Sequence, residues 1–65
     1  MRYVVDTFNG IAGESFDFDN LKDAEKCFDK EVAYRKERNL KFEFIELYTI
    51  DDNDNKIETL KEVYG

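Results

Sequence analysis

The chain has 65 residues and a formal net charge of -6, and 42% of its residues are hydrophobic, 15% aromatic and 40% charged. This length allows one domain with a small hydrophobic core, and the apolar fraction is too high for a disordered chain. The negative charge argues against direct nucleic-acid binding, because affinity for phosphate comes mainly from lysine and arginine. We therefore expect a single α+β domain spanning residues 1–65, with a heavily solvated surface.

The cysteine and histidine content further limits the kinds of protein that this chain can be. Cys27 is the only cysteine, which excludes an internal disulfide and favours a reducing, cytoplasmic setting. No apolar run approaches about 20 residues and no leader pattern opens the chain, so we expect neither export nor a membrane partner. The chain has no histidine, and no serine or cysteine has a recognisable base or oxyanion partner. We expect no enzyme activity and no cofactor.

Residues 2–9 and 14–18 predict the first two strands. The first segment is rich in β-branched and aromatic residues, and in the second two phenylalanines alternate with polar residues. Asn9 and Gly10, followed by Gly13, predict a chain reversal in which both glycines supply a positive φ. The glycine spacing matches neither a phosphate loop nor a nucleophile elbow. We expect an antiparallel hairpin.

The next segment, residues 20–38, is the only one with a helical period and the length to hold it. Asn20 suits the N-cap, and Asn39 tolerates the left-handed conformation that ends many helices. Glu31 and Arg35 are spaced for an intrahelical ion pair. At about 100° per residue one apolar arc forms. Its members are Leu21, Ala24, Cys27, Phe28, Val32 and Tyr34.

A second hairpin completes the predicted fold. Residues 40–50 are the strongest strand pattern and should be central in the sheet, residues 51–55 have turn composition, and residues 56–64 resume a strand pattern. The expected architecture is α+β in the order β-β-α-β-β, a small single-layer antiparallel sheet with one helix packed on one face.

Several strands are apolar on both faces, although one helix can cover only one face. In residues 40–50, one parity holds Phe42, Phe44, Tyr48 and Ile50, and the other holds Ile45, Leu47 and Thr49. In the last predicted strand, one face holds Ile57, Thr59 and Val63 and the other holds Leu60 and Tyr64. In the first, one face holds Val4 and Phe8 and the other holds Tyr3 and Val5. A β-bulge near residues 44–45 is the alternative, because it would bring both groups into the core.

Without such a bulge, the face away from the helix presents an apolar patch that a soluble monomer seldom leaves open. Carboxylates that surround aromatic side chains suit a basic partner, and Glu43, Glu46, Glu58 and Glu62 are placed to do so. The predicted partner-binding residues are Phe42, Phe44, Tyr48, Glu43, Glu46, Tyr3, Leu60 and Tyr64.

The acidic turn raises a calcium-binding alternative. Asp51, Asn53, Asn55 and Glu62 occupy positions one, three, five and twelve of EF-hand spacing. The sixth position, which requires glycine, holds Lys56, and strand patterns flank the turn. We therefore favour an ordinary hairpin turn and expect no metal site.

In size, acidity and lack of catalytic residues, the chain resembles the accessory proteins that phages and mobile elements encode, among them inhibitors of bacterial defence systems. This resemblance rests on general character and carries no motif. The leading hypothesis is a non-enzymatic protein-binding module, forming a homodimer, that docks an acidic and aromatic surface on a basic protein as a nucleic-acid mimic. The alternative is a self-associating structural domain with no other partner.

Overall fold

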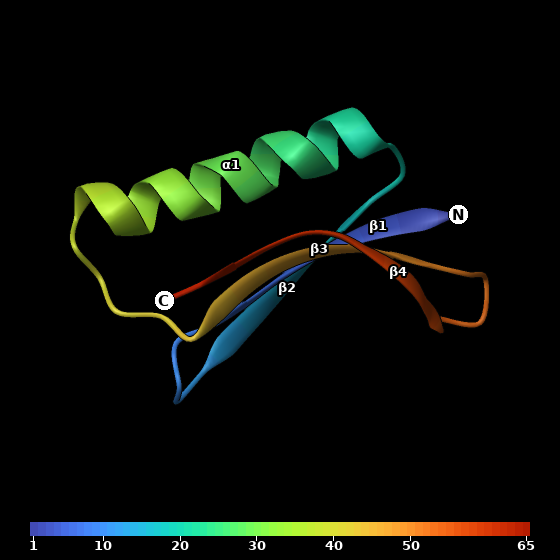
Figure 1. Cartoon of the computed structure of the whole chain (residues 1–65). Coiled ribbons are helices and arrows are strands. Elements are labelled where there is room, and N and C mark those ends of the chain that lie inside the picture. Colours follow the sequence, from blue (N-terminus) through green and yellow to red (C-terminus); the bar gives the residue numbers. More distant parts are fainter.

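The computed structural model describes residues 1–65. Its elements are β1 (Arg2–Phe8), β2 (Gly13–Phe18), α1 (Leu21–Glu37), β3 (Phe44–Ile50) and β4 (Lys56–Tyr64). The strands form one antiparallel sheet in the order β2-β1-β3-β4, and α1 crosses one face of it (Figure 1). The predicted α+β architecture and the central place of β3 are confirmed.

The ends of α1 follow the predicted capping residues. Asn20 is extended, with φ -137° and ψ 153°, and its side-chain oxygen accepts a hydrogen bond from the Asp23 amide at 2.9 Å. At the other end Asn39 has φ 53°, the left-handed conformation that stops the helix. Arg35 pairs with Glu31 at 3.0 Å. The predicted helix and its intrahelical ion pair are therefore confirmed.

The core lies between α1 and the two central strands. Ala24 and Phe28 of the helix pack on Val5 of β1 and on Ile45 and Leu47 of β3, and burying a side chain of this size contributes about 2 kcal/mol. Seven partly buried apolar residues surround this cluster, namely Tyr3, Phe16, Phe18, Cys27, Val32, Phe42 and Val63. Ala24 and Phe28 of the predicted helical arc are thus buried, whereas Leu21 and Tyr34, nearest the two ends of the helix, are 38% and 47% exposed.

The β1–β2 turn is held by Asn9. Its side-chain oxygen accepts hydrogen bonds from the amides of Ile11 at 2.9 Å and Ala12 at 2.8 Å, and Gly10 has φ 98°. The expectation of a second positive φ at Gly13 is wrong. A side chain is excluded at Gly13 for another reason, because a Cβ there would collide with the carbonyl oxygen of Thr7 across the hairpin.

The third strand begins later than predicted. Residues 40–43 lie outside β3, and the face assigned to Phe42 is corrected, because this side chain packs against the helix-side core. Phe42 precedes the paired part of the strand, so the alternation of side chains along β3 does not determine which face its side chain occupies. The connection is still tied down on both sides, since the Glu43 amide donates to the Phe8 carbonyl at 2.7 Å and the Gly65 amide donates to the Glu43 carbonyl at 3.1 Å.

The irregularity that we considered in β3 lies in β4 instead. Leu60 and Ile57 have no partner opposite them, so the register shifts twice along the β3–β4 ladder. Thr59 therefore reaches Glu46 on the face away from the helix, while Val63 packs against the core. The single parity that we predicted for Ile57, Thr59 and Val63 is wrong for this reason.

Candidate functional site

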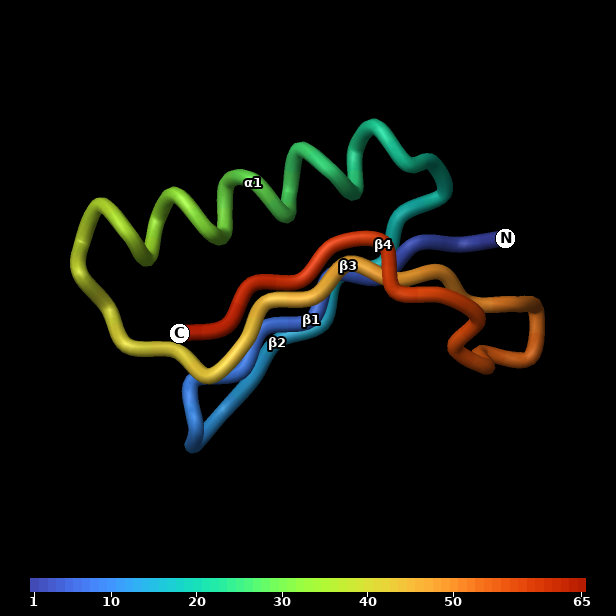
Figure 2. Tube along the Cα trace, viewed as in Figure 1, coloured from blue at the N-terminus to red at the C-terminus, as the bar shows by residue number.

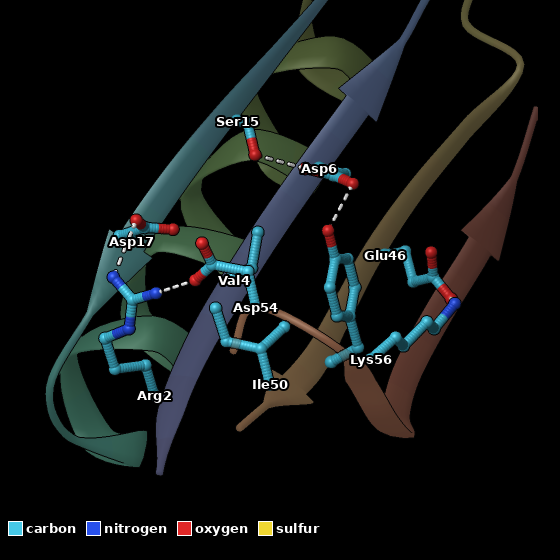
Figure 3. A pocket seen from close by; sticks show the side chains of 10 residues that line it. Arg2, Val4, Asp6, Ser15, Asp17, Glu46, Ile50, Asp54 and Lys56 are labelled. Atoms are coloured by element: carbon cyan, nitrogen blue, oxygen red, sulfur yellow. Dashed lines mark hydrogen bonds and ion pairs between the residues drawn. The ribbon is translucent and has the colours of Figure 1, made fainter. Parts of the chain in front are cut away.

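The sheet face away from α1, here called the open face, forms a concave surface that encloses about 450 Å³ (Figure 3). Side chains from all four strands and from the β3–β4 turn line it. They are Arg2, Val4, Asp6, Ser15, Asp17, Glu46, Tyr48, Ile50, Asp54 and Lys56. Strand alternation places these residues opposite the core residues of the same strands.

The floor of the open face is apolar, but other parts of the chain cover it. Val4 is only 3% exposed and Ile50 only 6%, although no helix covers them. The β3–β4 turn bends away from the helix side (Figure 2), and Asp54 of this turn forms an ion pair with Arg2 of β1. Arg2 also contacts Asp17 at 3.4 Å. The predicted exposure of Ile50 is therefore corrected, because these polar contacts lie over it and over Val4.

Tyr48 of β3 lines the open face and contacts residues of both neighbouring strands. Its hydroxyl donates a hydrogen bond to Asp6 at 2.8 Å, and the Ser15 hydroxyl donates to the other oxygen of Asp6 at 2.5 Å. Burial, together with the hydrogen bond to Asp6 and the negative charge of that carboxylate, raises the pKa of Tyr48. Tyr48 is thus a neutral hydrogen-bond donor near neutral pH, which argues against a role as a general base.

Lys56 shows how this face holds a cation. Its ammonium lies 2.6 Å from a carboxylate oxygen of Glu46 and 4.8 Å from the centre of the Tyr48 ring. The Thr59 hydroxyl donates to the same Glu46 oxygen at 2.8 Å. One ammonium group is therefore bound by a carboxylate and an aromatic ring together.

The open face carries more negative than positive charge. Its carboxylates are Asp6, Asp17, Glu46 and Asp54, and its cations are Arg2 and Lys56. The α1 segment holds as many basic as acidic residues, so the net charge of -6 arises from the sheet and the loops. The lining of the open face, with four carboxylates and two cations, contributes a net charge of -2 to this total.

The structure brings together only part of the predicted partner-binding set. Phe44, Glu46, Tyr48 and Tyr64 share the open face, where Phe44 also packs on Phe8 with ring centres 5.8 Å apart. The other four lie elsewhere: Tyr3 and Phe42 pack against the helix-side core, Glu43 precedes β3, and Leu60 is at a bulge on the β4 edge.

The charged residues that line the centre of the open face, other than Glu46, were not predicted from the sequence. These are Arg2, Asp6, Asp17, Asp54 and Lys56. Alternation with the buried residues of β1 and β2 could have placed Asp6 and Asp17 on this face, since both neighbour core residues in the sequence. The contact of Arg2 with Asp54 joins positions 52 residues apart and has no local signal.

The acidic turn is organised by its own backbone. The Asp51 carboxylate accepts hydrogen bonds from the amides of Asn53 at 2.8 Å and Asn55 at 3.0 Å, and these bonds lower its pKa. Glu62 pairs with Glu46, four residues before Ile50 on β3, or about 13 Å along the strand. The EF-hand arrangement is therefore not formed, and no group of three potential ligand side chains could hold a metal ion.

Together these features define a small α+β protein in which a helix covers one sheet face and the other face is an acidic hollow with an aromatic centre. No family model, curated protein or solved structure matches the chain. Its helix does not meet the length and apolarity that crossing a membrane requires.

Proposed function

We propose that this chain is a non-enzymatic protein-binding module that docks its open face on a basic surface of another protein. The supporting observation is the excess of carboxylates around Tyr48 on the sheet face that the helix leaves uncovered. An inhibitor that covers the nucleic-acid site of its partner is the specific form of this proposal, because such sites are rich in lysine and arginine.

The contact of Lys56 with Glu46 and Tyr48 illustrates the recognition that this proposal requires. A lysine or arginine of the partner would meet the same chemistry, a carboxylate beside an aromatic ring. The surrounding carboxylates would accelerate the encounter at low salt. Binding should therefore weaken as ionic strength rises.

A defined cationic probe tests this proposal. An amidated ten-residue arginine peptide is titrated into isotope-labelled protein, and the amide shifts are followed by NMR. We expect shifts at the strand residues of the open face, and an affinity about a hundredfold lower in the Asp17→Asn, Glu46→Gln double variant, as loss of two charge-assisted contacts of about tenfold each predicts.

The matched control removes two carboxylates from the opposite side of the molecule. Asp29→Asn with Glu37→Gln changes the net charge equally, and both residues are exposed on α1. This variant should bind the peptide nearly as well as the parent protein. Equal weakening by the two double variants would show that only net charge attracts the peptide, and would refute docking at the open face.

Self-association is the alternative that the sequence suggested, either as a homodimer or as a structural domain with no other partner. Two open faces would bring carboxylates of like charge together, which favours a basic partner over a second copy. The molar mass of the protein, measured by light scattering during size-exclusion chromatography, shows whether it is a monomer or pairs with a second copy. A stable dimer whose open-face amides are protected from exchange would favour the homodimer.

We also assign this module to a reducing, cytoplasmic compartment. Its single thiol, Cys27, packs beside the core, and burial together with the nearby charge of Glu31 raises the pKa of this thiol. A thiol of this kind is slow to react and needs no disulfide partner. Fractionation of the cells that produce the protein tests this assignment.

A further inference from the structure

The two edges of the sheet differ in regularity. Along the β4 edge, Ile57 and Leu60 interrupt the ladder. Bulges of this kind protect an edge from pairing with another chain. The β2 edge, Gly13–Phe18, pairs with β1 in an unshifted register and has no strand on its outer side. Alternate backbone N–H and C=O groups of β2 therefore point outward, free to pair with an added strand.

A groove runs between this free edge and the helix, because α1 packs mainly on β3 and β1. Two adjacent hollows of about 380 and 350 Å³ make up the groove, and both are lined by Phe16, Lys30 and Glu31. Phe18 and Cys27 extend the apolar lining at one end, and Tyr34 does so at the other. A side chain that points into this groove would meet aromatic rings and a thiol.

The groove carries three cationic side chains and three carboxylates, so its charges balance overall, and an acidic ligand is favoured only at its centre, where Lys30 lines both hollows. Lys26 and Lys30 line it, are exposed, and take part in none of the salt bridges of the molecule. The carboxylate of Glu31 is paired with Arg35 at 3.0 Å, and Asp23 accepts a hydrogen bond from the Asn20 amide group at 3.0 Å. Glu14 lies at the far end, in the hollow beside Tyr34. Two unpaired ammonium groups thus border the apolar part of the groove.

We propose that β2 and α1 together bind an extended segment of another protein, which adds to the sheet beside β2. Side chains of an added strand alternate, so every second one enters the groove. The matching segment carries an apolar side chain that contacts Phe16 and, two residues along, an aspartate or glutamate that meets Lys26 or Lys30. Side chains of the other parity face Ser15 and Asp17, where an acidic residue is disfavoured.

A synthetic peptide tests this arrangement. The probe is acetylated and amidated, with the sequence threonine-valine-threonine-glutamate-threonine-valine-threonine, and a second probe has lysine in place of glutamate. Binding of the first probe should shift the amides of residues 13–18 and slow hydrogen exchange at alternate positions of β2. The lysine probe should bind about tenfold more weakly, the factor expected for one lost charge-assisted contact.

Charge reversal on the helix supplies the matched variants. Lys26→Glu with Lys30→Glu should invert the preference, so that the lysine probe binds more tightly. Lys22→Glu with Lys36→Glu makes the same charge change at exposed positions that do not line the groove, and should leave the preference unchanged. All four lysines are exposed, so folding should be retained.

Three results would overturn the proposal. The first is the absence of β2 shifts at millimolar concentrations of the glutamate probe. The second is equal affinity for the two probes. The third is a dimer whose β2 amides are already protected without peptide, because a second copy would then occupy the edge.

Discussion

The Tyr48 hydroxyl donates a hydrogen bond to the Asp6 carboxylate at 2.8 Å, which joins two residues 42 positions apart. Asp6 also accepts a hydrogen bond from Ser15. These two contacts connect β3, β1 and β2 through one carboxylate on the face that has no helix. On the open face these polar contacts therefore join three strands, in addition to the hydrophobic core that lies on the opposite face.

Tyr48→Phe should lower the free energy of unfolding by about 1 kcal/mol, the usual net value of one hydrogen bond. The aromatic ring remains, so the loss reports the hydroxyl alone. Urea denaturation followed by circular dichroism measures it. Tyr64→Phe is the control, because the Tyr64 hydroxyl contacts only the exposed Glu62 and its removal should change stability little. Equal losses in the two variants would contradict the structural role of the Tyr48–Asp6 contact.

Stability should fall at alkaline pH, and Tyr48 should account for part of the decrease. Its pKa is raised in the folded protein, chiefly by burial and by the hydrogen bond to Asp6. Below about pH 10, the ordinary tyrosine pKa, both folded and unfolded chains hold this proton and the contribution is complete. Above that pH only the unfolded chain loses it, so unfolding is favoured. Denaturation at a series of pH values checks this, and Tyr48→Phe should flatten the decrease.

Asn20→Ala should lower the free energy of unfolding by about 1 kcal/mol, because the Asp23 amide loses its partner at the start of α1. Asn20→Asp retains a capping oxygen and should keep nearly all of the stability. Thermal and urea denaturation of both variants provide the measurement. A similar loss in the aspartate variant would show that the cap is not what stabilises this end of the helix.

Gly13→Ala should cost about 2 kcal/mol, the range expected when an added group has no space. The methyl group would collide with the Thr7 carbonyl oxygen, a backbone atom that cannot rotate away. Ala12→Gly removes a methyl group from the neighbouring exposed position and should have a small effect. Urea denaturation compares them, and an unchanged stability of Gly13→Ala would mean that β1 and β2 can separate at low cost.

The local signals in the sequence were sufficient for most of the fold. Asn20 and Asn39 mark the ends of α1 because capping depends on residues next to each other in the chain. The start of β3 could not be predicted in the same way, since Phe42 has strand propensity but packs against the core before the ladder begins. Propensity does not distinguish a paired strand from an extended connection.

The candidate site was harder to predict than the fold. Alternation placed Phe44 and Tyr48 together, and the structure bears this out. Whether such a face is exposed depends on what crosses it, and here Arg2 and Asp54 meet over Val4 and Ile50. That contact depends on the curvature of the last hairpin (Figure 2), which no local pattern of residue types predicts.

Because Ile57 and Leu60 are unpaired, the sheet has one irregular outer strand, β4, and one regular outer strand, β2. A molecule with a single regular outer strand can pair with one other molecule there, but it has no second regular strand with which a third molecule could pair. Strand pairing between copies of this chain should therefore produce no filaments, and no assembly larger than a dimer even at high protein concentration.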